Sequence, residues 1–242
     1  MPSTHTPSAN VHAAEIDKFS ALASHWWDPE GQLKTLHDIN PLRLDWIRQQ
    51  AGPLQGLKIL DVGCGGGLLA EAMAAEGAQV TGIDLSAQAL QIARLHGHES
   101  GIQVHYEHSS AEDWAQAHAG THDVVTCMEL LEHVPDPASV VHACATLARP
   151  GGLVCFSTLN RNPKSFLLAI VAAEYLLRML PRGTHNYEQF ITPSELAQAA
   201  RNAGLEVTAL AGIEYLPLLR RYTLSPRTGV NYLLAARRRL PD

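Results

Sequence analysis

The chain has 242 residues, of which 46% are hydrophobic and 17% are charged, and its formal net charge is −6. This length favours a single domain with a substantial core. The acidic balance excludes a typical nucleic-acid-binding surface, so we expect no nucleic-acid partner. No run of 18 uninterrupted apolar residues occurs, and no transmembrane helix is predicted.

The N-terminus and the cysteines indicate the compartment. Residues 1–12 are rich in Pro, Ser and Thr, and we expect them to be disordered, with one domain over 13–242. They carry neither an apolar run nor an Arg-rich pattern, so no secretory or transit signal is predicted. The four cysteines form no Cys-x-x-Cys pair, which fits a reducing cytoplasm (Cys64, Cys127, Cys144 and Cys155).

Two helices are predicted ahead of the first strand. The first, over 13–24, is followed by Trp26 and Trp27, which form either a lid over a ligand or an anchor to the core. Asn40 and Pro41 predict the start of the second helix, because Asn caps helices and Pro suits the first helical position.

A glycine-rich turn follows the first predicted strand. Ile59, Leu60 and Val62 form an apolar run typical of a strand buried on both faces. Four glycines within 63–67 come next, and a helix is predicted from residue 68. This arrangement brings a nucleotide onto backbone amides at a helix N-terminus.

The details of the turn exclude cofactors that bind through phosphates. The phosphate loop requires Lys and then Ser or Thr after its last glycine, and the dinucleotide fingerprint requires Gly where Leu68 stands. Asp61, at the strand tip, would repel a pyrophosphate and attract an ammonium or sulfonium. The turn therefore suits a cationic nucleoside such as S-adenosylmethionine.

Strands and helices alternate over the next hundred residues. Strands are predicted at 79–84, 103–107, 123–128 and 153–159, and late strands at 206–212 and 230–236 form an antiparallel pair at the sheet edge. The pattern predicts an α/β fold, a Rossmann-like, doubly wound, mostly parallel seven-stranded sheet. Ligands bind at the carboxyl ends of such strands, where several polar and small residues fall (Asp61, Gly63, Asp84, Glu112, Met128 and His133).

Several of these motifs together carry a family resemblance. The glycine turn, Asp84 and the Arg-Pro-Gly-Gly turn at 149–152 resemble class I S-adenosylmethionine-dependent methyltransferases over about residues 55–160. A narrower similarity, to the O-methyltransferases of ubiquinone biosynthesis, extends from about Ile16 to Tyr232. Its motifs are His-Trp-Trp-Asp at 25–28, Asn-Pro-Leu-Arg at 40–43, 127–137, 157–162 and Gly-Thr-His at 183–185.

The resemblance implies contacts with S-adenosylmethionine at Arg43, Gly63, Asp84 and Met128. A guanidinium can pair with the carboxylate of the cofactor, and a carboxylate can accept two ribose hydroxyls. Asp61 and Gly65 belong to the same turn and are expected to bind the cofactor too. The superfamily often has Asp where Ser110 stands, which leaves Ala111 and Glu112 as the candidates for adenine contacts.

The acidic motif after the fourth strand carries the predicted catalysis. O-methylation needs a phenolate from a hydroxyl of pKa about 10, so a base or a cation is required. We expect His133 to take the proton, with Glu132 or Glu129 orienting it. In relatives the same three residues are associated with a divalent metal such as Mg²⁺, and the alternative is that they shape the site without a metal.

An apolar segment with a basic margin follows the fifth strand, and 161–190 is expected to form an inserted helical lid. Over 161–182 there are four basic residues and one acidic residue, a local charge of +3. This fits an interfacial helix on anionic membrane lipids, and the alternative is a buried lid or dimer helix.

The resemblance implies an O-methyltransferase acting on phenol or catechol hydroxyls of polyprenylated intermediates, at both O-methylation steps of ubiquinone biosynthesis. Other proteins of the pathway would be partners, and the enzyme would be cytoplasmic and peripherally membrane-associated. The alternatives are another small-molecule methyltransferase and a lipid-binding protein with a vestigial cofactor pocket.

Overall fold

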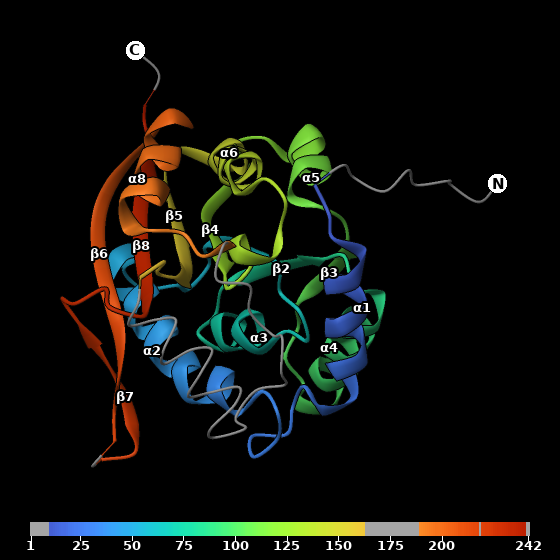
Figure 1. The fold of residues 1–242 in the computed structure, drawn as a ribbon. Helices are drawn as coiled ribbons and strands as arrows, with labels where there is room; N and C mark the ends of the chain where they lie inside the picture. The colour runs from blue at the N-terminus through green and yellow to red at the C-terminus, as the bar shows by residue number, and fades with distance from the viewer. Residues whose placement is uncertain (1–9, 163–188, 218, 241–242) are drawn as a thin grey trace.

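The predicted alternation of strands and helices produces one sheet in the computed structural model, which describes residues 10–162, 189–217 and 219–240 (Figure 1). The strands are β1 (Lys58–Val62), β2 (Gln79–Asp84), β3 (His105–His108), β4 (His122–Met128), β5 (Ala148–Leu159), β6 (Leu205–Leu216), β7 (Arg221–Ser225) and β8 (Asn231–Arg238). The helices are α1 (Ala13–Leu22), α2 (Lys34–Ala51), α3 (Leu68–Ala75), α4 (Ala87–Ser100), α5 (Ala111–His118), α6 (Pro137–Leu147) and α8 (Pro193–Asn202), with short 3₁₀ turns η1 (Ala23–His25) and η2 (Leu131–His133).

The described strands follow the order β3-β2-β1-β4-β5-β8-β6-β7. Strands β1 to β5 are parallel, while β8 runs antiparallel between β5 and β6. The mostly parallel Rossmann-like sheet is confirmed, but seven strands was wrong because β7 adds an eighth. It pairs with the end of β6, and its five residues are too few to give a clear periodic signal.

The late strands also differ from the prediction in position. β6 and β8 do pair antiparallel, as expected, but β8 lies inside the sheet and β7 forms the edge. Tyr232 to Ala236 of β8 are fully buried. A continuous apolar run in the last strand is therefore a sign of burial on both faces.

Helices cover both faces of the sheet, and successive residues of a strand point to opposite cores. In β5, Val154 and Phe156 pack with α5, α6 and α8, whereas Leu153 and Cys155 pack with α2, α3 and α4. The chain changes face between β3 and β4, so β1 and β4 lie side by side at the switch point. Ligands bind at this point in doubly wound sheets.

The predicted start of the second helix was wrong. α2 begins at Lys34, and Pro41 lies inside it. Proline lacks the N–H that would bond to the carbonyl four residues earlier. The segment stays helical because the packing of the buried Ile39, Trp46 and Ile47 outweighs this loss. The Asn40 side chain does not cap the helix and instead donates to the Leu68 carbonyl at 3.1 Å.

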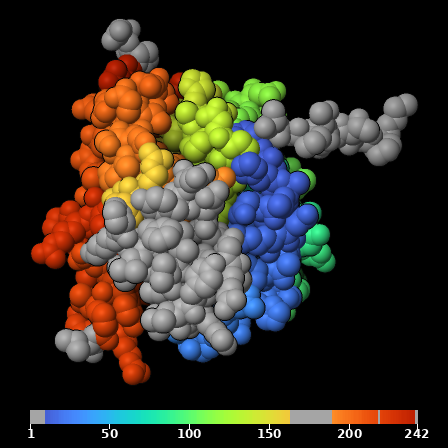
Figure 2. Space-filling view, in the orientation of Figure 1, coloured from blue at the N-terminus to red at the C-terminus, as the bar shows by residue number. Residues whose placement is uncertain are grey.

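The N-terminal segment is described from residue 10 onward, where hydrogen bonds join it to the rest of the domain. Asn10 accepts a hydrogen bond from the Asp136 N–H at 2.7 Å and donates to Glu112, which ties the start of α1 to the start of α6 (Figure 2). Of the stretch 1–12 that was predicted to be disordered, residues 1–9 lie outside the described residues, as does nearly all of the predicted insert. Within the described ranges, no helix is long and apolar enough to cross a membrane.

The buried Tyr232 hydroxyl gives a test of the sheet. It donates to the Ile191 carbonyl at 3.0 Å and joins β8 to the segment before α8. Tyr232→Phe should lower the free energy of unfolding by about 1 to 2 kcal/mol, because it leaves that carbonyl without a donor. Urea unfolding measures this, and Tyr215→Phe, whose side chain is 46% exposed, should change stability far less.

Candidate active site

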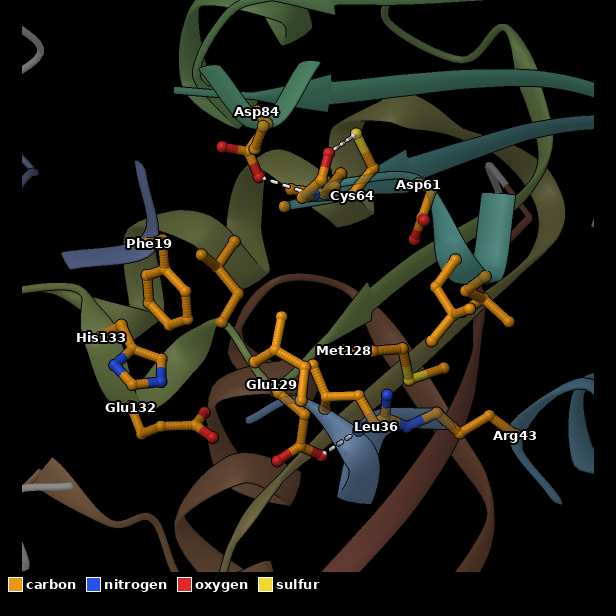
Figure 3. A pocket seen from close by; sticks show the side chains of 18 of the residues that line it. Phe19, Leu36, Arg43, Asp61, Cys64, Asp84, Met128, Glu129, Glu132 and His133 are labelled. Atoms are coloured by element: carbon orange, nitrogen blue, oxygen red, sulfur yellow. Dashed lines mark hydrogen bonds and ion pairs between the residues drawn. The ribbon is translucent and has the colours of Figure 1, made fainter. Parts of the chain in front are cut away.

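A cavity of about 670 Å³ lies at the carboxyl ends of β1, β2 and β4 (Figure 3). α1, α2 and the β6–β7 hairpin contribute further walls. The cavity brings together every residue predicted for the cofactor and for catalysis (Arg43, Asp61, Gly63, Gly65, Asp84, Ala111, Glu112, Met128, Glu129, Glu132 and His133).

The two tryptophans after η1 hold the glycine turn from the outside. The ring of Trp26 lies against the turn so closely that a Cβ on Gly65 would stand 2.1 Å from it, and Gly65 also has a left-handed φ of +52°. Trp27 stacks on His96 and donates to the Gly66 carbonyl at 3.0 Å. Trp26 is buried and lines the cavity, so it both anchors the core and covers the site.

Asp84 is fixed at the end of β2 by two backbone donors. Gly65 N–H reaches one carboxylate oxygen at 2.8 Å, and Ser86 N–H reaches the other at 2.7 Å. Burial raises the pKa of Asp84, while these hydrogen bonds oppose the shift. Each oxygen keeps a lone pair that can accept a hydroxyl in the cavity.

Arg43 and Asp61 place opposite charges on the floor of the cavity. Arg43 is 5% exposed, and its Nε and Nη2 atoms have no hydrogen-bond partner, although Nη2 lies 2.9 Å from Glu129 Oε1 as an ion pair. Asp61 accepts a hydrogen bond from Thr126 at 2.7 Å, and burial raises its pKa to about 7. Together they can receive a group that carries both a carboxylate and an ammonium.

The opposite end of the cavity lies at the start of α5. Ser110 caps this helix, and its hydroxyl donates to Asp113 at 2.8 Å. Glu112 Oε1 accepts from Asn10 and Ser139. Ala111 is buried among the lining residues, as is Met128, so each offers an apolar surface to a planar ring.

Glu129 occupies a strained position at the tip of β4. Its φ of +53° is unusual for a residue other than glycine. Its Oε1 atom accepts hydrogen bonds from Ser157 at 2.7 Å and Asn231 at 2.9 Å and faces Arg43. Burial alone would raise the pKa of Glu129, but the Arg43 charge and these donors outweigh it and lower the pKa.

The pKa of Glu132 is shifted in the opposite direction. It is 2% exposed, and burial together with the nearby Glu129 charge raises its pKa to about 7. Thr158 donates to Oε2 at 2.8 Å, but Oε1 has no hydrogen-bond partner. Glu132 therefore presents a carboxyl whose pKa suits proton exchange near neutral pH.

His133 is oriented by a residue that the sequence did not suggest. Its Nδ1 atom lies 2.7 Å from Glu15 Oε2 of α1, and the hydrogen bond lowers the pKa of Glu15. The ring of Phe19 packs edge-on against the imidazole at 5.1 Å (Figure 3). The hydrogen bond of His133 Nδ1 therefore goes to Glu15, and not to Glu129 or Glu132, which were expected to orient the ring.

The predicted metal site does not form either. Within the described ranges, no three His, Cys, Asp or Glu side chains converge as metal ligands, and these ranges include Glu129, Glu132 and His133. The physical reason is that each of the three has a different partner: Arg43, Thr158 and Glu15 respectively. The described residues therefore give no support to the predicted Mg²⁺ site.

Further residues of the site were missed in the sequence. Four residues donate hydrogen bonds to the carboxylates of the site. Thr126 donates to Asp61, and Thr158 donates to Glu132. Glu129 accepts from both Ser157 and Asn231. Ser157 and Thr158 lie in a motif that drew attention for its family resemblance, which was the available signal. Glu15 lies 118 positions from His133, and no local pattern relates them.

Comparison with known proteins defines the class first. A methyltransferase domain family model matches residues 25–210. Two solved structures share the fold: magnesium protoporphyrin IX methyltransferase from Synechocystis PCC 6803 with bound SAH (TM-score 0.69, 20% identity, 93% of this chain and 98% of that one), and a possible histamine N-methyltransferase from Thermotoga maritima (TM-score 0.68, 16% identity, 93% and 99%). The protein is an S-adenosylmethionine-dependent methyltransferase.

Relatives of high identity define the family. The ubiquinone biosynthesis O-methyltransferase of Bordetella avium is 63% identical over 236 residues, 98% of each chain. The protein of the same name from Thiobacillus denitrificans is 65% identical over 230 residues, 95% of this chain and 99% of the relative. The chain belongs to the family of ubiquinone biosynthesis O-methyltransferases, which confirms the resemblance and the predicted methyl donor.

The raised pKa of Glu132 predicts how stability depends on pH. Between about pH 4.5 and 7 the unfolded chain loses this proton while the folded chain keeps it, so the group destabilises the fold increasingly as pH rises. Glu132→Gln should therefore unfold at a higher denaturant concentration than the wild type above pH 7, and the two should converge near pH 4.

Glu195→Gln is the control, because its hydrogen bonds at the start of α8 lower the pKa of Glu195. This variant should lose stability in the same pH range. Equal denaturation midpoints for Glu132→Gln and the wild type from pH 4 to 8 would contradict the raised pKa.

Proposed function

We propose that this protein transfers a methyl group from S-adenosylmethionine to phenol or catechol hydroxyls of polyprenylated intermediates of ubiquinone biosynthesis, at both O-methylation steps. The names of the relatives support the pathway. The observation that carries the chemistry is the placement of Glu132 and His133 beside Arg43, Asp61 and Asp84 in one largely apolar cavity.

The residues present fit the cofactor. The Nε atom of the buried Arg43, which has no hydrogen-bond partner, suits its carboxylate, and Asp61 suits its ammonium. Asp84, held by two amides, would accept the ribose hydroxyls, and Gly63 lets the backbone approach. Ala111 and Met128 would bound the adenine, whereas Glu112 is engaged by Asn10 and Ser139 and would act by fixing the cavity wall.

Two groups in the cavity are suited to remove the hydroxyl proton. Bound S-adenosylmethionine supplies an electrophilic methyl group on a positively charged sulfur. Glu132 Oε1 is free to accept the proton, and its pKa of about 7 matches the task at neutral pH. His133 is the second candidate, and the Glu15 carboxylate would stabilise its protonated form. The apolar walls exclude water from the oxygen as it becomes negatively charged.

The direct test is methylation of a catechol that carries a short prenyl tail, measured as release of S-adenosylhomocysteine. We expect turnover with the wild type and kcat/KM rising with pH up to about 7, because the base must be unprotonated. Asp84→Ala should bind S-adenosylmethionine far more weakly in calorimetry. Absence of methylation with intact cofactor binding would contradict the proposed reaction.

Glu15 predicts a separable effect on catalysis. Glu15→Gln should lower kcat by about tenfold to a hundredfold, since the amide still holds the imidazole but cannot stabilise its charge. Because Glu15 acts through His133, the pH–rate profile should shift while cofactor affinity stays within about twofold.

Lys18→Met is the matched control for Glu15→Gln. It removes the 3.4 Å ion pair that Lys18 makes with the same Glu15 oxygen and leaves the contact with His133. It should retain wild-type kcat. If both variants behaved alike, the Glu15–His133 pair would have no part in catalysis.

We also propose that the segment 161–182 contacts anionic lipids, which would place a polyprenylated substrate near its membrane. Most of this segment lies outside the described residues. Its first member, Arg161, donates to the Phe190 carbonyl at 3.0 Å and pairs with Glu195. Its charge is therefore balanced within the fold, and the remaining basic residues of the segment (Lys164, Arg178 and Arg182) would have to attract the lipid.

A further inference from the structure

One wall of the cavity is a hairpin that extends beyond the rest of the sheet. β8 begins at Asn231, which pairs with Ile213 of β6. β6 continues for three residues, Glu214 to Leu216, and these pair only with β7 among the described strands. At about 3.3 Å per residue, the hairpin rises roughly 10 Å past the carboxyl edge (Figure 1).

The hairpin turns an apolar face toward α2. Ile213 and Tyr215 of β6 and Tyr222 of β7 line the cavity, and the two tyrosine rings lie 5.0 Å apart. Among the described hairpin residues that line the cavity, only Glu214 is charged. This wall therefore offers little to a polar ligand.

α2 supplies the opposite wall with residues one helical turn apart. Leu36, Ile39 and Arg43 follow each other along one side of the helix and all line the cavity. Thr35 of α2 and Tyr222 of β7 both line the cavity, where the helix lies against the hairpin. The polar member of the stripe, Arg43, lies at the catalytic end beside Glu129, and the apolar members lead away from it.

The cavity is thus divided by chemistry. Its inner part holds the carboxylates, Arg43 and His133, and its outer arm between α2 and the β6–β7 hairpin is apolar. The arm ends at exposed residues, since Tyr215 is 46% exposed and Leu219 in the turn is 60% exposed. An open, apolar arm joined to a reaction centre suits a long hydrocarbon group that continues out of the protein.

We propose that this arm is the binding site for the isoprenoid tail of the substrate, with Leu36, Ile39, Ile213, Tyr215 and Tyr222 in contact with the first isoprene units. The inference rests on the proposed function and specifies where the tail leaves the active site. The arm selects substrates by their tail, while the inner cavity acts on the hydroxyl. The tail beyond Tyr215 continues into the surroundings, so total tail length has little influence.

The test compares a catechol with no tail and the same catechol with two isoprene units, in detergent without vesicles so that membrane binding does not contribute. The wild type should prefer the prenylated substrate by about tenfold or more in kcat/KM, as expected for burying one or two branched five-carbon groups. Tyr215→Asp should lower this preference about tenfold, because it places a charge in the arm.

Leu210→Asp is the matched control, since Leu210 is on the same strand, is 44% exposed and does not line the cavity. It should keep the wild-type preference. A wild type that methylates both substrates equally well, or a Tyr215→Asp variant with the wild-type preference, would overturn the tail site and leave the proposed reaction intact. A wild type that methylates neither substrate would overturn the proposed reaction and the tail site together.

Discussion

The active site depends on one buried ion pair. Arg43 and Glu129 lie 2.9 Å apart, with the Arg43 side chain 6% exposed and the Glu129 side chain 18% exposed. Ser157 of β5 and Asn231 of β8 donate to the same oxygen of Glu129, so α2, β4, β5 and β8 meet at one atom. Removing one partner of such a pair typically costs about 3 to 5 kcal/mol, because an unpaired charge stays buried. This network holds Glu129 in its left-handed conformation and thereby fixes the residue at which β4 ends.

The same network gives two neighbouring carboxylates different pKa values. Glu129 keeps its charge because Arg43 and two donors surround it. Burial of Glu132 and the nearby charge of Glu129 together raise the pKa of Glu132 to about 7. Pairs of acidic groups whose surroundings push their pKa values apart are typical of catalytic sites.

The fold, and the gathering of the expected cofactor residues around one cavity, could be predicted from the sequence because their signals are local. Apolar runs, the glycine turn and Asp84 each lie within a few residues of the element that they specify, and the carboxyl ends of parallel strands then bring them together. The partners of the catalytic residues could not be predicted in this way. Glu15 reaches His133, and Asn231 reaches Glu129, only after the sheet has brought distant segments together. The start of α2 was misplaced because packing of Trp46 and Ile47 outweighs the local preference of Pro41.

The position of β8 has a consequence for biosynthesis. Among the described strands it comes last in the chain, yet it lies between β5 and β6 with five fully buried residues in succession. While the ribosome still holds residues 231–238, the long β5 has no neighbour on one side and exposes an apolar edge capable of aggregation. A premature stop codon before residue 231 would delete a central strand, Asn231 and the support of Glu129. The nascent protein therefore completes its sheet and its active site together, and only after β8 has been made.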